Sequence, residues 1–178
     1  LLELGSGIGA LVESFPPQIE VVLMDAAPAM LAESKKRNPH RQHLCMDMTE
    51  FTIERSFDAI LLHDAVMYLT SRAELLSCFA SAYRHLQEGG CFLIIPDTAE
   101  GYFEEHAVSG GAESGEHAVQ LLEWHWDPDP LDDFITVEFS MLIRERGFVQ
   151  AVHESHRMSV FSLSAWSDVY IEAGFTMN

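Results

Sequence analysis

A glycine-rich turn directly after a short apolar run sets the strongest limit on the fold. Leu1 to Leu4 is typical of the end of a buried strand, and Gly5 to Gly9 then carries a glycine at every second position. Glycine permits a sharp turn and lets a ligand approach the backbone closely. The next residues are predicted to form a helix to about Ser14, whose first turn would present free N–H groups. The sequence thus predicts a strand, a ligand-binding turn and a helix.

Short apolar runs alternate with helical patterns through the first half of the chain. Further strands are predicted at Ile19 to Met24, Gln42 to Met46, Phe57 to Leu62 and Cys91 to Ile95. Strands separated by helices indicate βαβ units around a parallel sheet, with helices on both faces. We therefore expect an α/β fold with three layers.

Two helices of this half have recognisable ends. Pro28 suits the first turn of a helix that ends near Asn38. Ser71 and Glu74 form a capping box, and apolar residues at helical spacing follow it as far as Leu86. The pair Gly89-Gly90 is predicted to end this second helix.

The second half of the chain has a different pattern. An acidic, glycine-bearing segment from Thr98 to Glu116 is predicted to be a short helix and a mobile loop. Three longer strands are then predicted at His117 to Trp126, Phe134 to Ile143 and Phe148 to Val160. Their short connections favour an antiparallel meander. A last helix is predicted from Leu163 to Ala173, with Gly174 after its end.

Polar residues follow several of the predicted parallel strands, where ligands of such sheets bind. The glycine turn leaves the ligand open, because Gly5, Gly7 and Ala10 also satisfy the G-x-G-x-x-G/A pattern of dinucleotide sites. Asp25 could accept hydrogen bonds from ribose hydroxyls, whether the ligand is a dinucleotide or a nucleoside that carries a methionine moiety. Glu3 favours the ligand with the methionine moiety, because the Glu3 carboxylate would crowd a pyrophosphate but could hold the ammonium group of methionine.

Asp47 and Met48 follow the third predicted strand. Asp47 could accept a hydrogen bond from an adenine amino group while Met48 flanks the ring. The alternative is that Asp47 is a turn or capping residue.

Together these segments resemble a known family. The stretches LLELGSGIG, VVLMDAAPAM, CMDM, FDAILLHDAVMYL and LQEGGCFLI occur in the order and spacing of class I S-adenosylmethionine-dependent methyltransferases. The resemblance covers about half the chain and implies a Rossmann-like sandwich with an antiparallel β insertion after the fifth strand. It also implies S-adenosylmethionine as cofactor. The residues that it assigns to this cofactor are Glu3, Gly5, Ser6, Gly7, Asp25, Ala26, Met30, Asp47, Met48 and His63.

The acceptor side is predicted from residues after the fourth strand. His63 could act as general base, Asp64 could orient His63 or bind a cationic amine, and Tyr68 could donate a hydrogen bond. The alternative is that His63 packs on the cofactor and Asp64 caps a turn, because a sulfonium leaving group needs proximity more than a base.

The second half adds candidates for the acceptor site. Trp124 and Trp126 share one face of their predicted strand and are candidates for an aromatic wall, or else for a core or interface face. His156 lies on a face of the last strand that could close the same pocket. The β insertion also resembles the acceptor cover of amino-sugar methyltransferases.

Composition limits the partners. Ten Lys and Arg residues against 28 Asp and Glu residues give a net charge of −18, which opposes binding to nucleic acid or anionic membranes. Three widely spaced cysteines suggest no disulfide framework and favour the cytoplasm. No spacing calls for a metal site. A homodimer through the β insertion is a further prediction.

These patterns predict methyl transfer to nitrogen or oxygen of a small molecule by in-line displacement. The predicted divisions are a cofactor-binding core at 1–96, the insertion at 97–161 and a return helix of the core at 162–178. The core is expected to be truncated at both ends, because the chain starts inside an apolar run and stops where a further strand is expected. The alternatives are an NAD(P)-dependent oxidoreductase and a non-catalytic cofactor-binding or scaffold protein.

Overall fold

The computed structural model describes residues 1–176 and divides the chain into two compact units. The first unit contains residues 1–97 together with the C-terminal segment from Leu163. The second unit contains residues 98–162. None of the helices in the described residues is long and apolar enough to cross a membrane.

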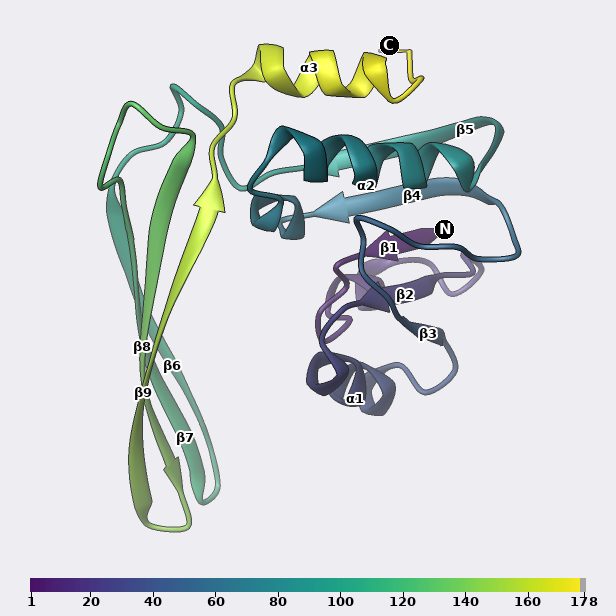
Figure 1. The fold of residues 1–178 in the computed structure, drawn as a ribbon. Helices are drawn as coiled ribbons and strands as arrows, with labels where there is room; N and C mark the ends of the chain where they lie inside the picture. Colours follow the sequence, from purple (N-terminus) through teal and green to yellow (C-terminus); the bar gives the residue numbers. More distant parts are fainter. Residues whose placement is uncertain (177–178) are drawn as a thin grey trace. The chain divides into compact units, whose positions relative to one another are not determined.

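The first unit is built on a five-stranded parallel sheet (Figure 1). Its strands are β1 (Leu2–Leu4), β2 (Val22–Asp25), β3 (Gln42–Cys45), β4 (Phe57–His63) and β5 (Leu86–Ile95). They lie in the order β3-β2-β1-β4-β5. The order reverses between β1 and β4, and such a reversal creates the crevice where ligands of open α/β sheets bind. The predicted α/β class is confirmed.

Helices and the central strands enclose the core of this unit. All residues of β1 are buried, as expected for a strand between two parallel neighbours. The helices are α1 (Pro28–Arg37), α2 (Arg72–Arg84) and α3 (Leu163–Glu172). Phe79 of α2 is fully buried, with ring contacts to Phe92 of β5 and Tyr170 of α3. The Tyr170 hydroxyl donates to the Phe92 carbonyl at 2.8 Å, which ties α3 to the sheet.

The predicted capping box at the start of α2 is confirmed. The Glu74 N–H donates to Ser71 Oγ at 3.2 Å. Glu74 Oε2 in turn accepts from the N–H of Thr70 at 2.9 Å. Helix α1 has no such side chain at its start, since Ala27 stands at the capping position and Pro28 begins the helix.

One predicted helix of the first unit differs in type, and one predicted helix end is wrong. After the glycine turn there is only the 3₁₀ helix η1 (Leu11–Ser14), because Pro16-Pro17 leaves no room for a full α-helix. Helix α2 ends at Arg84, and Leu86 and the Gly89-Gly90 pair belong to β5. The pairing of Leu86 with Phe57 across the sheet overrides the helical spacing of Leu86.

The second unit is a four-stranded antiparallel meander. Its strands are β6 (His106–Ser114), β7 (His117–Trp126), β8 (Phe134–Glu145) and β9 (Phe148–Ser159). The three predicted long strands are confirmed. The prediction for Thr98 to Glu116 is wrong, because about half of this segment is the exposed edge strand β6. The small residues of β6 obscured the strand pattern in the sequence. One of them, Gly111, lies so close to β7 that a Cβ there would come within 2.6 Å of the Val119 carbonyl.

Candidate cofactor and acceptor site

The glycine turn after β1 depends on left-handed backbone at Gly5 (φ 64°), Gly7 (φ 55°) and Gly9 (φ 69°). The Ser6 N–H donates to the Met24 carbonyl of β2 at 2.9 Å. A Cβ on Gly7 would meet no atom within 4 Å, so the middle of the turn borders open space. The turn is therefore anchored to β2 and leaves backbone accessible to a ligand.

Gly5 lies against the segment that follows β4. A Cβ on Gly5 would come within 2.2 Å of Ala65 Cβ, so no larger residue fits there. Ala65 begins the 3₁₀ helix η2 (Ala65–Tyr68) and follows Asp64 directly. The glycine turn and the predicted acceptor residues are thus packed together at the carboxyl ends of neighbouring strands β1 and β4.

Asp25 ends β2 and connects two loops. Its Oδ2 accepts from the Gly7 N–H at 2.7 Å, and its Oδ1 accepts from the Ala27 N–H at 2.8 Å. A carboxylate offers about four acceptor positions, so the two oxygens retain capacity for ribose hydroxyls. Asp25 therefore shapes the glycine turn in addition to its predicted role, and sequence reasoning missed this contact.

Glu3 carries an unusual buried carboxyl group. The residue is only 4% exposed, and Glu3 Oε2 has no hydrogen-bond partner among the described residues. Burial raises the pKa of Glu3 from 4.5 to about 7. Ser6 is also buried, and its Oγ is likewise unpartnered within the described chain. Buried polar groups are normally paired, so these atoms indicate a polar ligand that supplies a donor.

The predicted adenine residues lie in the loop after β3 and on α1. Asp47 Oδ1 accepts from the N–H and the hydroxyl of Thr49 at 2.8 and 2.7 Å, which is the turn geometry of the alternative interpretation. Met48 is half-buried, and Met30 on α1 is 48% exposed. Ala26 is exposed beside Asp25, and its carbonyl accepts from Cys45 Sγ at 3.8 Å. The contact of Met30, Asp47 and Met48 with adenine stays a prediction, as does the contact of Ala26 with the cofactor.

The acceptor candidates gather at the end of β4. His63 Nε2 lies 3.0 Å from Asp64 Oδ1. The Asp64 N–H donates to the Ile95 carbonyl at 2.9 Å, which links the ends of β4 and β5. Asp64 has a φ of 51°, an uncommon conformation for a residue other than glycine. Tyr68 is 48% exposed at the end of η2.

The Asp64 carboxyl group has a partner that sequence reasoning missed. Burial, followed by a hydrogen bond to Asp97 and the charge of Asp97, raises the pKa of Asp64 from 3.8 to about 6, and His63 opposes the rise. Asp97 lies two residues beyond the end of β5. The strand-end rule that selected Asp25 would have selected Asp97 as well.

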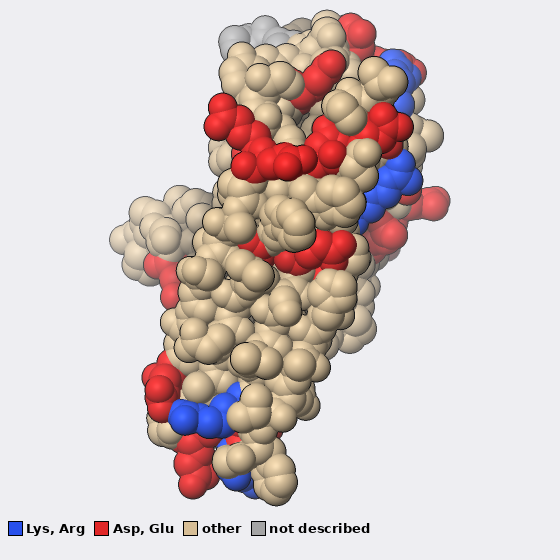
Figure 2. Space-filling model, turned by 90° about the vertical axis from the view of Figure 1, so that its left-hand side faces the viewer, with Lys and Arg blue, Asp and Glu red and all other residues tan. Residues whose placement is uncertain are grey.

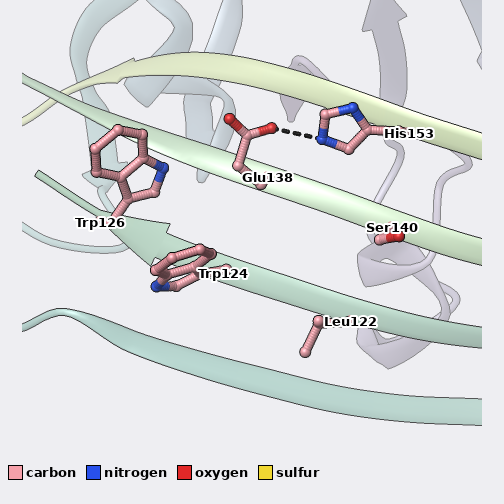
Figure 3. A pocket seen from close by; sticks show the side chains of 6 residues that line it. All are labelled: Leu122, Trp124, Trp126, Glu138, Ser140 and His153. Atoms are coloured by element: carbon pink, nitrogen blue, oxygen red, sulfur yellow. Dashed lines mark hydrogen bonds and ion pairs between the residues drawn. The ribbon is translucent and has the colours of Figure 1, made fainter. Parts of the chain in front are cut away.

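The tryptophans of the second unit line a surface pocket on β7, β8 and β9 (Figure 3). The pocket has a volume of 520 Å³ and is lined by Leu122, Trp124, Trp126, Glu138, Ser140 and His153. The two indole rings lie 6.1 Å apart, and His153 Nε2 lies 2.8 Å from Glu138 Oε2. The prediction that Trp124 and Trp126 share one face is confirmed.

His156 does not line this pocket. It pairs with Val137, which pairs with His125, whereas Trp124 pairs with Glu138. Adjacent residues of a strand point to opposite faces, so His156 lies on the face away from the tryptophans. On that face the centroids of the His156 and Phe139 rings lie 5.0 Å apart. The grouping of His156 with the aromatic wall is therefore corrected.

Comparison with known families decides among the alternatives. The family described as "Methyltransferase domain" matches residues 2–94, which is more than half of the chain. The chain belongs to this methyltransferase family. The match spans β1 to β5 almost completely and includes the glycine turn, Asp25, Asp47 and the His63-Asp64 pair. An NAD(P)-dependent oxidoreductase is therefore set aside.

Two curated relatives are sugar N,N-dimethyltransferases. The chain is 30% identical over 98 residues to dTDP-3-amino-3,4,6-trideoxy-alpha-D-glucopyranose N,N-dimethyltransferase of Streptomyces venezuelae. This match covers 54% of the chain and 41% of the relative. The chain is also 23% identical over 156 residues to dTDP-3-amino-3,6-dideoxy-alpha-D-glucopyranose N,N-dimethyltransferase of Streptomyces fradiae. This second match covers 86% of the chain and 60% of the relative. The matches thus span roughly half the length of these methyltransferases.

Solved structures share the fold of this chain over nearly its whole length. The match with DesVI of Streptomyces venezuelae covers 99% of this chain and 75% of the DesVI chain, with a TM-score of 0.87 and 20% identity. The match with the sugar N-methyltransferase KedS8 from Streptoalloteichus covers 97% of this chain and 70% of the KedS8 chain, with a TM-score of 0.85 and 24% identity. The predicted fold, with its antiparallel strands after the fifth parallel strand, is confirmed.

Proposed function

We propose that the chain is the core of an S-adenosylmethionine-dependent methyltransferase that methylates a nitrogen atom of a small molecule. The observation that carries the proposal is the buried, unpartnered Glu3 carboxyl beside the glycine turn. A carboxyl in this position suits the ammonium group of the methionine moiety, because a charged donor satisfies Glu3 Oε2. A pyrophosphate there would be repelled.

The cofactor spans the carboxyl ends of the four strands β1 to β4 in this proposal. Glu3, Gly5, Ser6 and Gly7 hold the methionine part. Asp25 and Ala26 hold the ribose, and Met30, Asp47 and Met48 surround adenine. His63 lies beside the methyl group, which the cofactor presents as an activated sulfonium methyl. The open space over Gly7 and the unpartnered Ser6 Oγ fit such a ligand.

The acceptor is an amine in this proposal. Both curated relatives are named for N,N-dimethyl transfer to 3-amino sugars. His63, Asp64 and Tyr68 stand at the carboxyl end of β4, and they orient the acceptor for in-line displacement or act on its proton. The acceptor roles predicted for Trp124, Trp126 and His156 of the second unit stay predictions.

We also propose that two copies of the chain associate through the four-stranded sheet. Leu122, Trp124 and Leu142 lie on one face of this sheet and are 48–53% exposed. Figure 2 shows a broad area without charged residues over the middle of this sheet, with acidic residues above and below it and Lys and Arg residues near its lower end. Exposed apolar patches of this kind mark interfaces.

The exposed cysteines Cys45 and Cys91 suit a reducing cytoplasm.

Ligand binding by the full-length protein tests the proposed cofactor. S-adenosylhomocysteine should raise the melting temperature, and NAD should not. Glu3→Gln should weaken S-adenosylhomocysteine binding at neutral pH, whereas Glu88→Gln on the exposed part of β5 should not. Equal stabilisation by NAD, or equal affinity of both variants, contradicts the proposal. Sedimentation of Trp124→Glu against the unchanged protein tests the dimer.

A further inference from the structure

Asp64 and Asp97 bring two carboxyl groups together at the ends of adjacent strands. The backbone bond from the Asp64 N–H to the Ile95 carbonyl continues the pairing of β4 and β5 beyond His63. It fixes Asp64 next to the segment that carries Asp97, and a side-chain hydrogen bond with Asp97 contributes to the raised pKa of Asp64. A hydrogen bond between carboxyl groups needs a proton on one of them. Such a pair can hold one proton between its two groups.

The pair is poised to exchange that proton near neutral pH. Burial is the largest cause of the raised pKa of Asp64, and the hydrogen bond and charge of Asp97 follow. Together they raise the pKa of Asp64 to about 6. His63 acts in the opposite direction from a distance of 3.0 Å. The Asp64 side chain is half exposed, so a ligand can reach it. Above this pKa the pair carries two negative charges and attracts a cation.

The pair lies beside the proposed cofactor site. Ala65, the residue after Asp64, packs against Gly5 of the glycine turn. Strand β1 and the glycine turn carry the unpartnered atoms Glu3 Oε2 and Ser6 Oγ, and both residues are more than nine-tenths buried. These atoms indicate a ligand at this edge of the sheet independently of the two aspartates. A group bound to the pair therefore stands next to that ligand.

An amine acceptor must lose a proton before it can react. At neutral pH an alkyl amine is mostly an ammonium ion, and its nitrogen lone pair is blocked. We propose that the Asp64–Asp97 pair binds the ammonium group of the acceptor and takes up one of its protons. The inference rests on the methyltransferase function proposed above and selects an amine over a hydroxyl group as acceptor.

The proposed step is balanced. The N–H bond of the ammonium breaks, its proton moves to the carboxylate pair, and the nitrogen keeps the electron pair. This pair then forms the N–CH₃ bond as the S–CH₃ bond breaks, and the sulfur keeps the electrons of the broken bond. The product amine is again cationic, and the pair returns its proton to solvent. His63 then acts as a positioning residue that holds Asp64.

Paired acceptors test the proposal in the full-length protein. The amine probes are dTDP-3-amino-3,4,6-trideoxy-alpha-D-glucopyranose, glucosamine and tyramine, each compared with a counterpart that carries a hydroxyl group instead. Methylation is followed by mass for the unchanged protein, Asp64→Asn, Asp97→Asn and the control Asp58→Asn. Asp58 is an exposed aspartate at the other end of β4. At least one amine, and no hydroxyl counterpart, should be methylated.

The pH profile separates proton transfer from a structural role. For the unchanged protein, kcat/KM for the amine should rise with pH through about 6 as the pair loses its shared proton. Asp97→Asn should lower kcat/KM by about 10²-fold and move this rise to lower pH, because the neighbouring negative charge is gone. Asp58→Asn should change neither. His63→Ala should keep the rise, since the pair and not the imidazole takes the proton.

S-adenosylhomocysteine affinity distinguishes the two proposals. It should stay within a few-fold of the unchanged protein in Asp64→Asn and Asp97→Asn. If the unchanged protein does not bind this ligand, the proposed function fails. If it binds the ligand but methylates no amine, both proposals fail. If it methylates an amine but Asp97→Asn matches Asp58→Asn in rate and profile, the carboxyl-pair inference fails alone. A rise that disappears in His63→Ala also overturns the inference.

Discussion

The central strands of the parallel sheet cover their apolar side chains within the chain, whereas the antiparallel sheet leaves many of its own uncovered. Leu2, Leu4, Ile60 and Leu62 in β1 and β4 are each 0% exposed. Helices and the crossover segments of the parallel unit account for this burial. On β7 and β8, Trp124 and Leu142 are more than half exposed.

The two sheets also differ in how their carboxyl groups are paired. The parallel unit buries Glu3 without a partner in the described chain, and it gathers carboxyl groups at the strand ends. In the antiparallel unit the carboxylates of Glu123, Glu138 and Glu154 are paired with histidines of the same sheet. A stable core can hold costly unpaired polar groups, and such groups mark the site where a ligand completes the pairing.

The largest effect should follow from removing a core side chain of the parallel unit. Phe79→Ala should lower the free energy of unfolding by about 3–5 kcal/mol, because it leaves a cavity among the rings of Phe92 and Tyr170. Urea unfolding of the full-length protein measures this. A loss below about 1 kcal/mol would show that this core does not dominate the stability of the unit.

The buried carboxyl should make stability depend on pH. The folded state holds the proton of Glu3 up to about pH 7, whereas the unfolded chain releases it near 4.5. Without cofactor, this contribution to stability is fully present below pH 4.5 and is lost as pH rises to 7. Glu3→Gln should therefore be up to about 3 kcal/mol more stable than the unchanged protein at pH 8, but not at pH 4. Unfolding at both pH values checks the sign, with Glu88→Gln as control.

A smaller effect should appear at Asp25. Asp25→Ala should weaken S-adenosylhomocysteine binding by about 1–3 kcal/mol, measured by calorimetry. It should also lower the stability of the ligand-free protein, because the Gly7 and Ala27 N–H groups lose their acceptor. Asp58→Ala serves as the matched exposed control. An unchanged affinity would remove Asp25 from the ribose site and leave it only a structural role.

The smallest effect should come from the exposed face of the antiparallel sheet. Leu142→Ser should change the unfolding free energy by less than about 0.5 kcal/mol at protein concentrations where the chain is monomeric. At higher concentration it should reduce the dimer fraction in sedimentation. A large loss of stability in the monomer would mean that this face is covered within one chain, and the contrast between the sheets would then disappear.

Much of the parallel unit follows from local sequence signals. Apolar runs located its five strands, the Ser71–Glu74 box located α2, and strand-end positions selected Glu3, Asp25 and Asp64. These signals are readable because buried parallel strands need continuous apolar residues, and because glycines at left-handed positions have few substitutes. The family resemblance rested on the same residues and is confirmed by the match over residues 2–94.

The amino-acid sequence by itself determined the order of elements in the parallel unit and the chemistry available at its strand ends. Only the tertiary structure decided that Asp97 pairs with Asp64, that β6 joins the meander, and that His156 faces away from Trp124. Each of these depends on which strands lie side by side and in what register. Pairing between distant segments sets both, and a shift of one residue would turn every side chain of a strand to the other face.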